Sequence, residues 1–117
     1  MKANVKFYKC LECGNVAGLM KDKGGDLACC EKAMELLTPG NADTKYAPRV
    51  VRDGEFLILS AEPGAEWLSA VGTRGTVRVT LAEYDEPKVK VYCPDCTEGE
   101  TDVYAYYNER GLFRTII

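Results

Sequence analysis

Histidine is absent from the 117 residues of this chain. The chain therefore lacks the side chain that most often acts as general acid or base near neutral pH, and a carboxylate would have to take that role. The acidic residues Glu83, Asp85 and Glu86 precede Pro87, where charged side chains are usual in a solvated turn. We see no nucleophile paired with a base and name no catalytic residue. We expect a protein that is not an enzyme, although the sequence leaves an enzyme open.

Long apolar runs are also missing. The longest, such as residues 56–59 (FLIL), have the length of a strand and cannot cross a bilayer, and residues 1–6 lack the apolar core of a secretory signal. A net charge of -3 with scattered Lys and Arg provides no attraction for phosphate backbones. We therefore expect a cytoplasmic protein that binds neither nucleic acid nor membranes.

The residues that are present predict a mainly β protein with two domains. A hydrophobic share of 46% with 28% charged residues is typical of a chain with a packed core. Residues 39–48 are polar and contain Pro and Gly, and we interpret them as a linker between domains at residues 1–38 and 49–117. Beyond the linker, apolar and polar residues alternate, which predicts an antiparallel β-sandwich.

The individual elements follow from short β-branched and aromatic runs between turn residues. One helical candidate, a turn or two, falls in residues 31–37, and the pattern of residues 65–68 is ambiguous. The expected strands are residues 5–9, 15–20, 27–30, 55–60, 75–83, 88–92, 102–107 and 112–117.

Four of the six cysteines form two pairs near the N-terminus. Cys10 and Cys13 are separated by two residues in a turn after a strand, and Cys29 is followed directly by Cys30. A CxxC turn directs two thiolates toward one ion while N–H groups of the loop donate to the sulfurs. The adjacent pair can complete a tetrahedron only if the backbone bends sharply, because neighbours in a strand point to opposite faces. The pattern predicts one metal ion bound by four thiolates in a distorted site.

A disulfide framework, or a few buried thiols, is the alternative interpretation. A disulfide between adjacent residues conflicts with a planar trans peptide, and the cytosol keeps thiols reduced. A segment of this size also buries too little apolar surface to fold alone, so we favour the metal and expect folding to depend on it. Four thiolates accept iron or zinc, and the ligands alone do not distinguish the two.

The N-terminal third also resembles a known family. Residues 7–16 (FYKCLECGNV) and 24–30 (GGDLACC) resemble desulforedoxin and the matching N-terminal domain of desulfoferrodoxin, the two-domain superoxide reductase. The resemblance implies a high-spin iron that is held by the four cysteines, cycles between Fe2+ and Fe3+, and commonly sits in a homodimer. Zinc at the same cysteines stays the alternative.

The second domain carries local traces of the same family, whose catalytic iron is held by four histidines and one cysteine on an immunoglobulin-like sandwich. Residues 45–48 (KYAP) resemble its Lys-His-Val-Pro segment, with Tyr46 in the place of histidine. Residues 106–114 resemble its Tyr-Cys-Asn-x-His-Gly-Leu-Trp-Lys segment, with Tyr107 and Arg110 at the ligand positions. The resemblance implies an immunoglobulin-like sandwich without its catalytic iron, and the missing histidines exclude superoxide reductase activity there. An unrelated β domain is the alternative.

A further pair, Cys93 and Cys96, lies at the junction of a strand and a loop. A thioredoxin-type redox pair needs a helix N-terminus at its first cysteine, and the sequence predicts none here. A metal knuckle needs a second half, which a twofold partner would have to supply. We leave three interpretations open: a redox pair, a second metal site shared across a dimer axis, or incidental thiols that form a disulfide in air.

The functional hypothesis is a non-haem iron protein that transfers single electrons or senses redox state, with a redox protein as partner. Four thiolates fill the coordination shell and leave no open position for a substrate or an activated water. The competing hypothesis is a zinc-stapled structural module whose β domain binds a protein partner.

Overall fold

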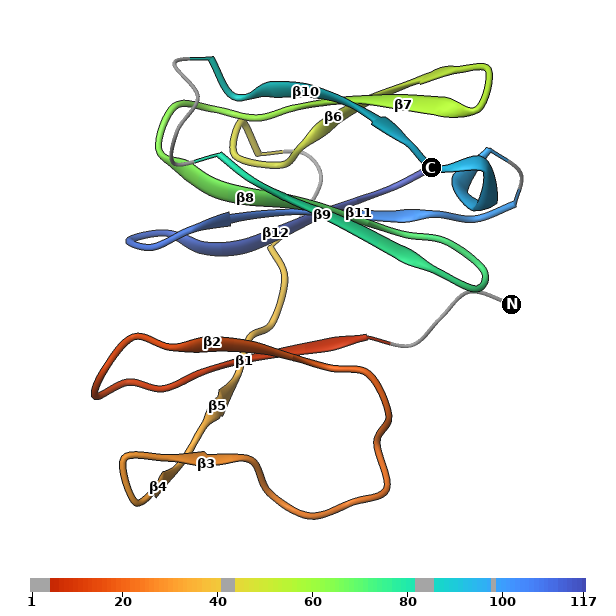
Figure 1. Ribbon diagram of the computed structural model, residues 1–117. Helices are drawn as coiled ribbons and strands as arrows, with labels where there is room; N and C mark the ends of the chain where they lie inside the picture. Colours follow the sequence, from red (N-terminus) through yellow and green to blue (C-terminus); the bar gives the residue numbers. More distant parts are fainter. Residues whose placement is uncertain (1–4, 41–43, 82–85, 98) are drawn as a thin grey trace. The chain divides into compact units, whose positions relative to one another are not determined.

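The computed structural model describes residues 5–40, 44–81, 86–97 and 99–117, and the structural statements below concern those residues. Their contacts divide them into an N-terminal unit that ends at Thr38 and a C-terminal unit that extends from Pro39 to Ile117. Each unit is described by itself. Strands make up nearly all the regular structure (Figure 1). Within the described ranges, no helix has the length and apolar character that crossing a membrane requires.

The N-terminal unit is built from two small antiparallel sheets. The first has the order β2-β1-β5, and its central strand pairs Phe7 with Gly18 and Tyr8 with Leu36. The second is the hairpin β3–β4, in which Cys29 pairs with Lys32. The strands are β1 (Lys6–Lys9), β2 (Val16–Leu19), β3 (Ala28–Cys29), β4 (Lys32–Ala33) and β5 (Glu35–Leu36).

The prediction of a helical turn in residues 31–37 is wrong, because this segment forms β4 and β5. Cys30 and Glu31 have φ angles of 54° and 64°, which reverse the chain and send Lys32 back along β3. Leu37 then donates its backbone N–H to the carbonyl of Phe7 at 2.8 Å. A helix here would have had little to pack against, since Leu36 is half exposed. Pairing of β4 with the neighbouring strand β3 and of β5 with the distant strand β1 therefore determines this segment.

The C-terminal unit is a sandwich of two antiparallel sheets, which lie one above the other in Figure 1. One sheet has the order β10-β7-β6 and the other the order β12-β11-β8-β9. The strands are β6 (Arg49–Asp53), β7 (Phe56–Ser60), β8 (Ala65–Val71), β9 (Thr76–Thr80), β10 (Lys88–Tyr92), β11 (Asp102–Tyr107) and β12 (Gly111–Ile116). The predicted mainly β fold with an antiparallel sandwich is confirmed.

The core of the sandwich lies between its two sheets. Leu57 and Leu59 of β7 face Leu68 of β8 and Val103 of β11, and all four are fully buried.

Two strands were not predicted from the sequence pattern. Residues 49–53 were not assigned, and β8 is buried at six of its seven positions, so it shows no alternation. The end of the expected strand 75–83 lies outside the described residues.

The segment expected to be a linker contributes to the C-terminal unit where it is described. Gly40 donates its N–H to the carbonyl of Leu112 at 2.8 Å and accepts from the N–H of Arg114 at 3.3 Å. A Cβ on Gly40 would come within 2.8 Å of the Phe113 ring, so only glycine fits this contact. Ala47 and Pro48 are buried.

Candidate metal centre

The first pair of thiols is positioned by a closed loop at the end of β1. Cys10 donates its backbone N–H to the carbonyl of Asn15 at 2.8 Å, and Gly14 donates to the carbonyl of Cys10 at 2.9 Å. Gly14 has a φ of 83°, a conformation that glycine adopts without a steric penalty. These bonds curl the CxxC segment so that Cys10 and Cys13 lie on the same side.

The second pair is positioned by the turn between β3 and β4. Adjacent residues of an extended strand point to opposite faces, but Cys30 and Glu31 are both in the left-handed region. The turn brings Sγ of Cys29 and Sγ of Cys30 to 3.9 Å from each other. The sharp bend that two adjacent ligands require is therefore present in the backbone.

The four sulfurs form one compact cluster. All four Sγ atoms of Cys10, Cys13, Cys29 and Cys30 lie within 4.8 Å of one another, and those of Cys13 and Cys29 are 3.6 Å apart. A tetrahedral ion with metal–sulfur bonds of about 2.3 Å needs sulfurs separated by about 3.8 Å. The donor set and its spacing therefore fit an iron or zinc ion.

The thiols influence one another's protonation strongly. The backbone N–H of Cys13 is the main cause that lowers the pKa of Cys10 to about 7. The neighbouring thiols, that of Cys13 first, raise the pKa of Cys30 to about 12 and also raise the pKa of Cys29. Four close thiolates repel one another, so a bound cation is what allows all of them to be deprotonated together.

Further contacts hold the cluster and leave one edge open to solvent. The side-chain amide of Asn15 donates to Sγ of Cys29 at 3.7 Å, and Lys32 Nζ contacts Glu12 Oε1 at 2.6 Å, which links the two cysteine-bearing loops. Cys10 is buried, whereas Cys13 and Cys30 are exposed. Asn15 belongs to the segment that carries the family resemblance, but its hydrogen bond to Cys29 is visible only in the structure, because the two residues are distant along the chain.

Aromatic side chains fill the place in the C-terminal unit where the family resemblance located a second metal. The rings of Tyr46 and Tyr107 meet edge to face at 5.4 Å, and the ring of Phe113 lies within 5.7 Å of both. The hydroxyl of Tyr107 donates to the carbonyl of Tyr46 at 2.9 Å and accepts from the N–H of Glu62 at 3.1 Å. Burial is the main cause that raises the pKa of Tyr107. The Arg110 guanidinium lies 4.5 Å from the Tyr46 ring centre.

Tyr107 belongs to the core cluster of the sandwich, and Tyr46 and Phe113 are partly buried against it. Among the described residues, the four N-terminal cysteines are the one group of His, Cys, Asp or Glu side chains close enough to share an ion.

Cys93 and Cys96 are joined by a disulfide, with their Cα atoms 5.3 Å apart. Both residues are buried, and a short 3-10 helix, η1 (Pro94–Cys96), begins directly after Cys93. The sequence had predicted no helical turn at this position.

The acidic turn before Pro87 is described only from Glu86 onward.

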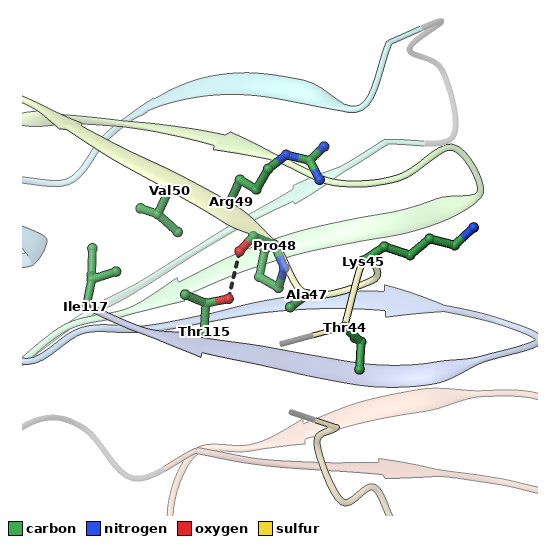
Figure 2. A pocket seen from close by; sticks show the side chains of 8 residues that line it. All are labelled: Thr44, Lys45, Ala47, Pro48, Arg49, Val50, Thr115 and Ile117. Atoms are coloured by element: carbon green, nitrogen blue, oxygen red, sulfur yellow. Dashed lines mark hydrogen bonds between the residues drawn. The ribbon is translucent and has the colours of Figure 1, made fainter. Parts of the chain in front are cut away.

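A surface groove of about 640 Å³ lies beside β6 and β12. Figure 2 shows the Thr115 hydroxyl donating to the carbonyl of Pro48, at 2.7 Å. Arg49 is held by Glu62 at 3.5 Å, so its charge is already partly compensated. The groove contains no nucleophile with a base beside it. Its lining residues are Thr44, Lys45, Ala47, Pro48, Arg49, Val50, Thr115 and Ile117.

Comparisons with known proteins agree with the cluster and with the fold. Residues 3–37 match the family described as desulfoferrodoxin, N-terminal domain. The superoxide reductase from Treponema pallidum has a similar crystal structure, with a TM-score of 0.79 at 19% sequence identity over 97% of this chain and 98% of that one.

Curated relatives match over most of their length. A desulfoferrodoxin from Syntrophotalea carbinolica is 27% identical over 125 residues, which cover 97% of both chains. A desulfoferrodoxin from Nitratidesulfovibrio vulgaris is 40% identical over 102 residues, which cover 77% of this chain and 81% of the relative. The identity and coverage of this last match are sufficient to assign a family. The chain therefore belongs to the desulfoferrodoxin family.

Proposed function

We propose that this chain is an iron protein whose four-cysteine centre transfers single electrons or reports the redox state of its surroundings. The observation that carries the proposal is the compact sulfur cluster, in which four thiols lie within 4.8 Å of one another. Four thiolates complete a tetrahedral shell, and a complete shell favours a change of oxidation state over the binding of a substrate. Bound iron would supply a ferrous–ferric couple at this site.

The protein residues around the cluster support such a role. The side-chain amide of Asn15 and the N–H groups of the CxxC loop donate toward sulfur, which offsets the negative charge of the thiolates. Two backbone hydrogen bonds close the CxxC loop at Cys10, and the exposed ion pair of Lys32 with Glu12 adds a weak link to the second loop. Sulfurs that keep their positions when the charge of the centre changes lower the reorganisation that accompanies each electron transfer.

One edge of the centre is suited to contact with a redox protein. Cys13 and Cys30 are exposed, and Leu11, inside the CxxC loop, is 72% exposed. An apolar side chain beside exposed ligands gives a partner protein a short route to the sulfurs. We place this exchange in the cytoplasm, where thiols stay reduced.

We further propose that the C-terminal unit does not reduce superoxide, although a superoxide reductase has a similar fold. Tyr46, Tyr107 and Arg110 stand where the family resemblance located metal ligands, and the tyrosine rings pack against each other there. The hydrogen bonds of the Tyr107 hydroxyl go to backbone groups. The chain has no histidine that could rebuild the lost site from another position.

Metal counting with visible and redox spectroscopy tests the electron-transfer proposal. Full-length protein is loaded with ferrous salt without oxygen and then oxidised. We expect one iron per chain and sulfur-to-iron charge-transfer bands that bleach on reduction and return on oxidation. The Cys13→Ser variant should lose these bands, whereas the neighbouring Leu11→Ala variant should keep them. Protein that retains zinc, stays colourless and rejects iron would overturn the proposal in favour of the zinc-stapled module.

Superoxide consumption tests the second part of the proposal. The iron-loaded chain should remove superoxide no faster than the Cys13→Ser variant does. Rapid removal that persists in this variant would show a catalytic site elsewhere in the chain and would contradict the proposed loss of function.

A further inference from the structure

Cys93 and Cys96 have no part in the function proposed above, yet they occupy a distinctive place in the C-terminal unit. Both belong to the core cluster between the two sheets, with 4% and 0% of their surface exposed. A metal shared across a dimer axis would need four sulfurs from two copies around one ion, which two folded chains cannot bring together at this depth. A small dithiol needs to reach only one sulfur, that of the slightly exposed Cys93. The geometry instead favours chemistry within the pair.

We propose that Cys93 and Cys96 are a second redox site, a reversible disulfide that exchanges two electrons with dithiols and transmits its state through Asp95 to the turn of residues 72–75. The proposal is independent of the metal at the N-terminal cysteines. Its steps follow from the contacts around η1.

Hydrogen bonds hold the two ends of η1 in the sandwich independently of the disulfide. Cys93 donates its N–H to the carbonyl of Glu55 at 2.9 Å, and the carbonyl of Cys96 accepts from the Thr101 hydroxyl at 3.3 Å and from Arg52 Nε at 3.4 Å. The bond itself closes a loop of only four residues, which removes little chain entropy from the unfolded state. The pair can therefore open and close without unfolding the sandwich.

Opening the bond must nevertheless move the turn. Two thiols that are not bonded stand much farther apart than bonded sulfurs do, as the 3.6 Å and 3.9 Å contacts in the N-terminal cluster illustrate. Close packing around buried Cys96 leaves little room for this separation inside the core. The extra space has to come from a shift of the backbone between the two cysteines.

Asp95 lies on that backbone and connects it to the turn between β8 and β9. Its Oδ2 accepts from the N–H of Arg74 at 2.5 Å and from the N–H of Gly75 at 3.0 Å. A Cβ added to Gly72 would lie 2.7 Å from the Asp95 carbonyl, so the two backbones are already in contact. A displacement of η1 is therefore felt directly by the turn of residues 72–75.

The exchange is balanced with a dithiol as co-reactant. A thiolate of the reductant attacks one sulfur of the pair, breaks the S–S bond and forms a mixed disulfide. The second thiol of the reductant then displaces that sulfur and closes its own disulfide. The protein gains two electrons and two protons as two thiols, and the reductant loses the same. Oxidised dithiol reverses the reaction.

The test uses full-length, iron-loaded protein in anaerobic buffers with different ratios of reduced to oxidised dithiothreitol. Alkylation followed by peptide mapping measures the thiols of Cys93 and Cys96, and hydrogen exchange measures the amides of Arg74 and Gly75. We expect Cys93 and Cys96 to change together between disulfide and thiols. The amides of Arg74 and Gly75 should exchange about tenfold faster in the reduced protein, because their hydrogen bonds to the Asp95 carboxylate weaken. The turn of residues 108–110, in the same unit, should not change.

Asp95→Asn provides the matched variant, since it keeps both thiols and the size of the side chain. Its turn amides should exchange fast in both redox states while the cysteines still interconvert. Equal protection of Arg74 and Gly75 in oxidised and reduced wild-type protein would overturn the transmission step. A pair that stays reduced in fully oxidised buffer, or stays oxidised in fully reduced buffer, would overturn the redox site.

Discussion

Tyr107 combines apolar packing with two hydrogen bonds in the C-terminal unit. Its ring packs against Tyr46 and Phe113, and its hydroxyl joins the carbonyl of Tyr46 to the N–H of Glu62. These two backbone groups lie in different connections of the sandwich. One phenol therefore supplies apolar contact and ties two loops together at the position that the family resemblance assigned to a sulfur ligand.

Removing the hydroxyl of Tyr107 tests this role. In the Tyr107→Phe variant the carbonyl of Tyr46 and the N–H of Glu62 lose their partner while the ring packing is kept. We expect the free energy of unfolding of the C-terminal unit to fall by about 1–3 kcal/mol, the usual cost of leaving such groups without a hydrogen bond. Urea denaturation followed by fluorescence measures it. Tyr92→Phe, at a residue that is 58% exposed, should change stability little.

Glu31 shows the cost of placing two adjacent cysteines on one ion. With a φ of 64° it lies in a region that costs a residue with a side chain about 1–2 kcal/mol. Cys30 bears the same strain but cannot be replaced without losing a thiol. The backbone strain of this turn therefore accompanies the arrangement that places Cys29 and Cys30 on one ion.

Among the secondary-structure elements, the turn between β3 and β4 should lose backbone strain when glycine replaces Glu31. Glycine adopts a positive φ freely, so Glu31→Gly should stabilise the metal-loaded N-terminal unit by about 1 kcal/mol. Resistance to a competing chelator measures the effect. Lys32→Gly, one residue later in a regular strand, should weaken the unit instead, and equal effects of the two changes would contradict the role of the turn.

The turn of residues 72–75 makes a second element-scale prediction, which concerns pH. Hydrogen bonds to Asp95, that from the backbone N–H of Arg74 first, lower the pKa of its carboxyl below the ordinary value of 3.8. A carboxyl with a lowered pKa in the folded state contributes stability above its ordinary pKa, and this contribution is lost as the pH falls through the lowered value.

The difference in urea midpoint between wild type and Asp95→Asn measures that contribution. The difference in midpoint should have its largest value at pH 6 and shrink from about pH 4 downward. At still lower pH it should approach a constant value. Because release of the metal in acid affects both proteins alike, it cancels in the comparison. A difference that does not vary with pH would show that the Asp95 carboxylate does not stabilise the fold through its charge.

At the scale of the whole molecule, the two units differ in what holds them together. In the described part of the N-terminal unit, only Phe7 and Cys10 are buried, whereas the C-terminal unit has a continuous core between two sheets. A unit with so little buried apolar surface needs another source of stability, and metal binding to four thiols provides it.

Metal removal should therefore unfold one unit and spare the other. After treatment with a strong chelator in acid and return to neutral pH, backbone amides of residues 5–38 should lose their protection from hydrogen exchange, while those of the sandwich keep it. Adding ferrous iron back without oxygen should restore the protection. An N-terminal unit that stays protected without metal would contradict this dependence.

The sequence anticipated the family and the cofactor because both depend on short local patterns. Cys10 and Cys13 lie in one turn and Cys29 and Cys30 in another, so residue spacing was sufficient to recognise them. Membership of the desulfoferrodoxin family, together with the four-thiol cluster, confirms iron as the predicted cofactor. The homodimer and the redox partner stay predictions, which measurement of the mass in solution and of electron exchange between proteins can address.

The thiol ligand set, the lack of histidine ligands and the alternating strands of the sandwich could be predicted from the sequence, because each is a property of residue type or near-neighbour spacing. Strand β5, the burial of β8 and the contacts of Tyr107 could not be predicted, because they depend on residues that are distant along the chain. The hairpin β3–β4 and the Cys93–Cys96 disulfide join near neighbours, and the folded backbone between them determines whether they meet.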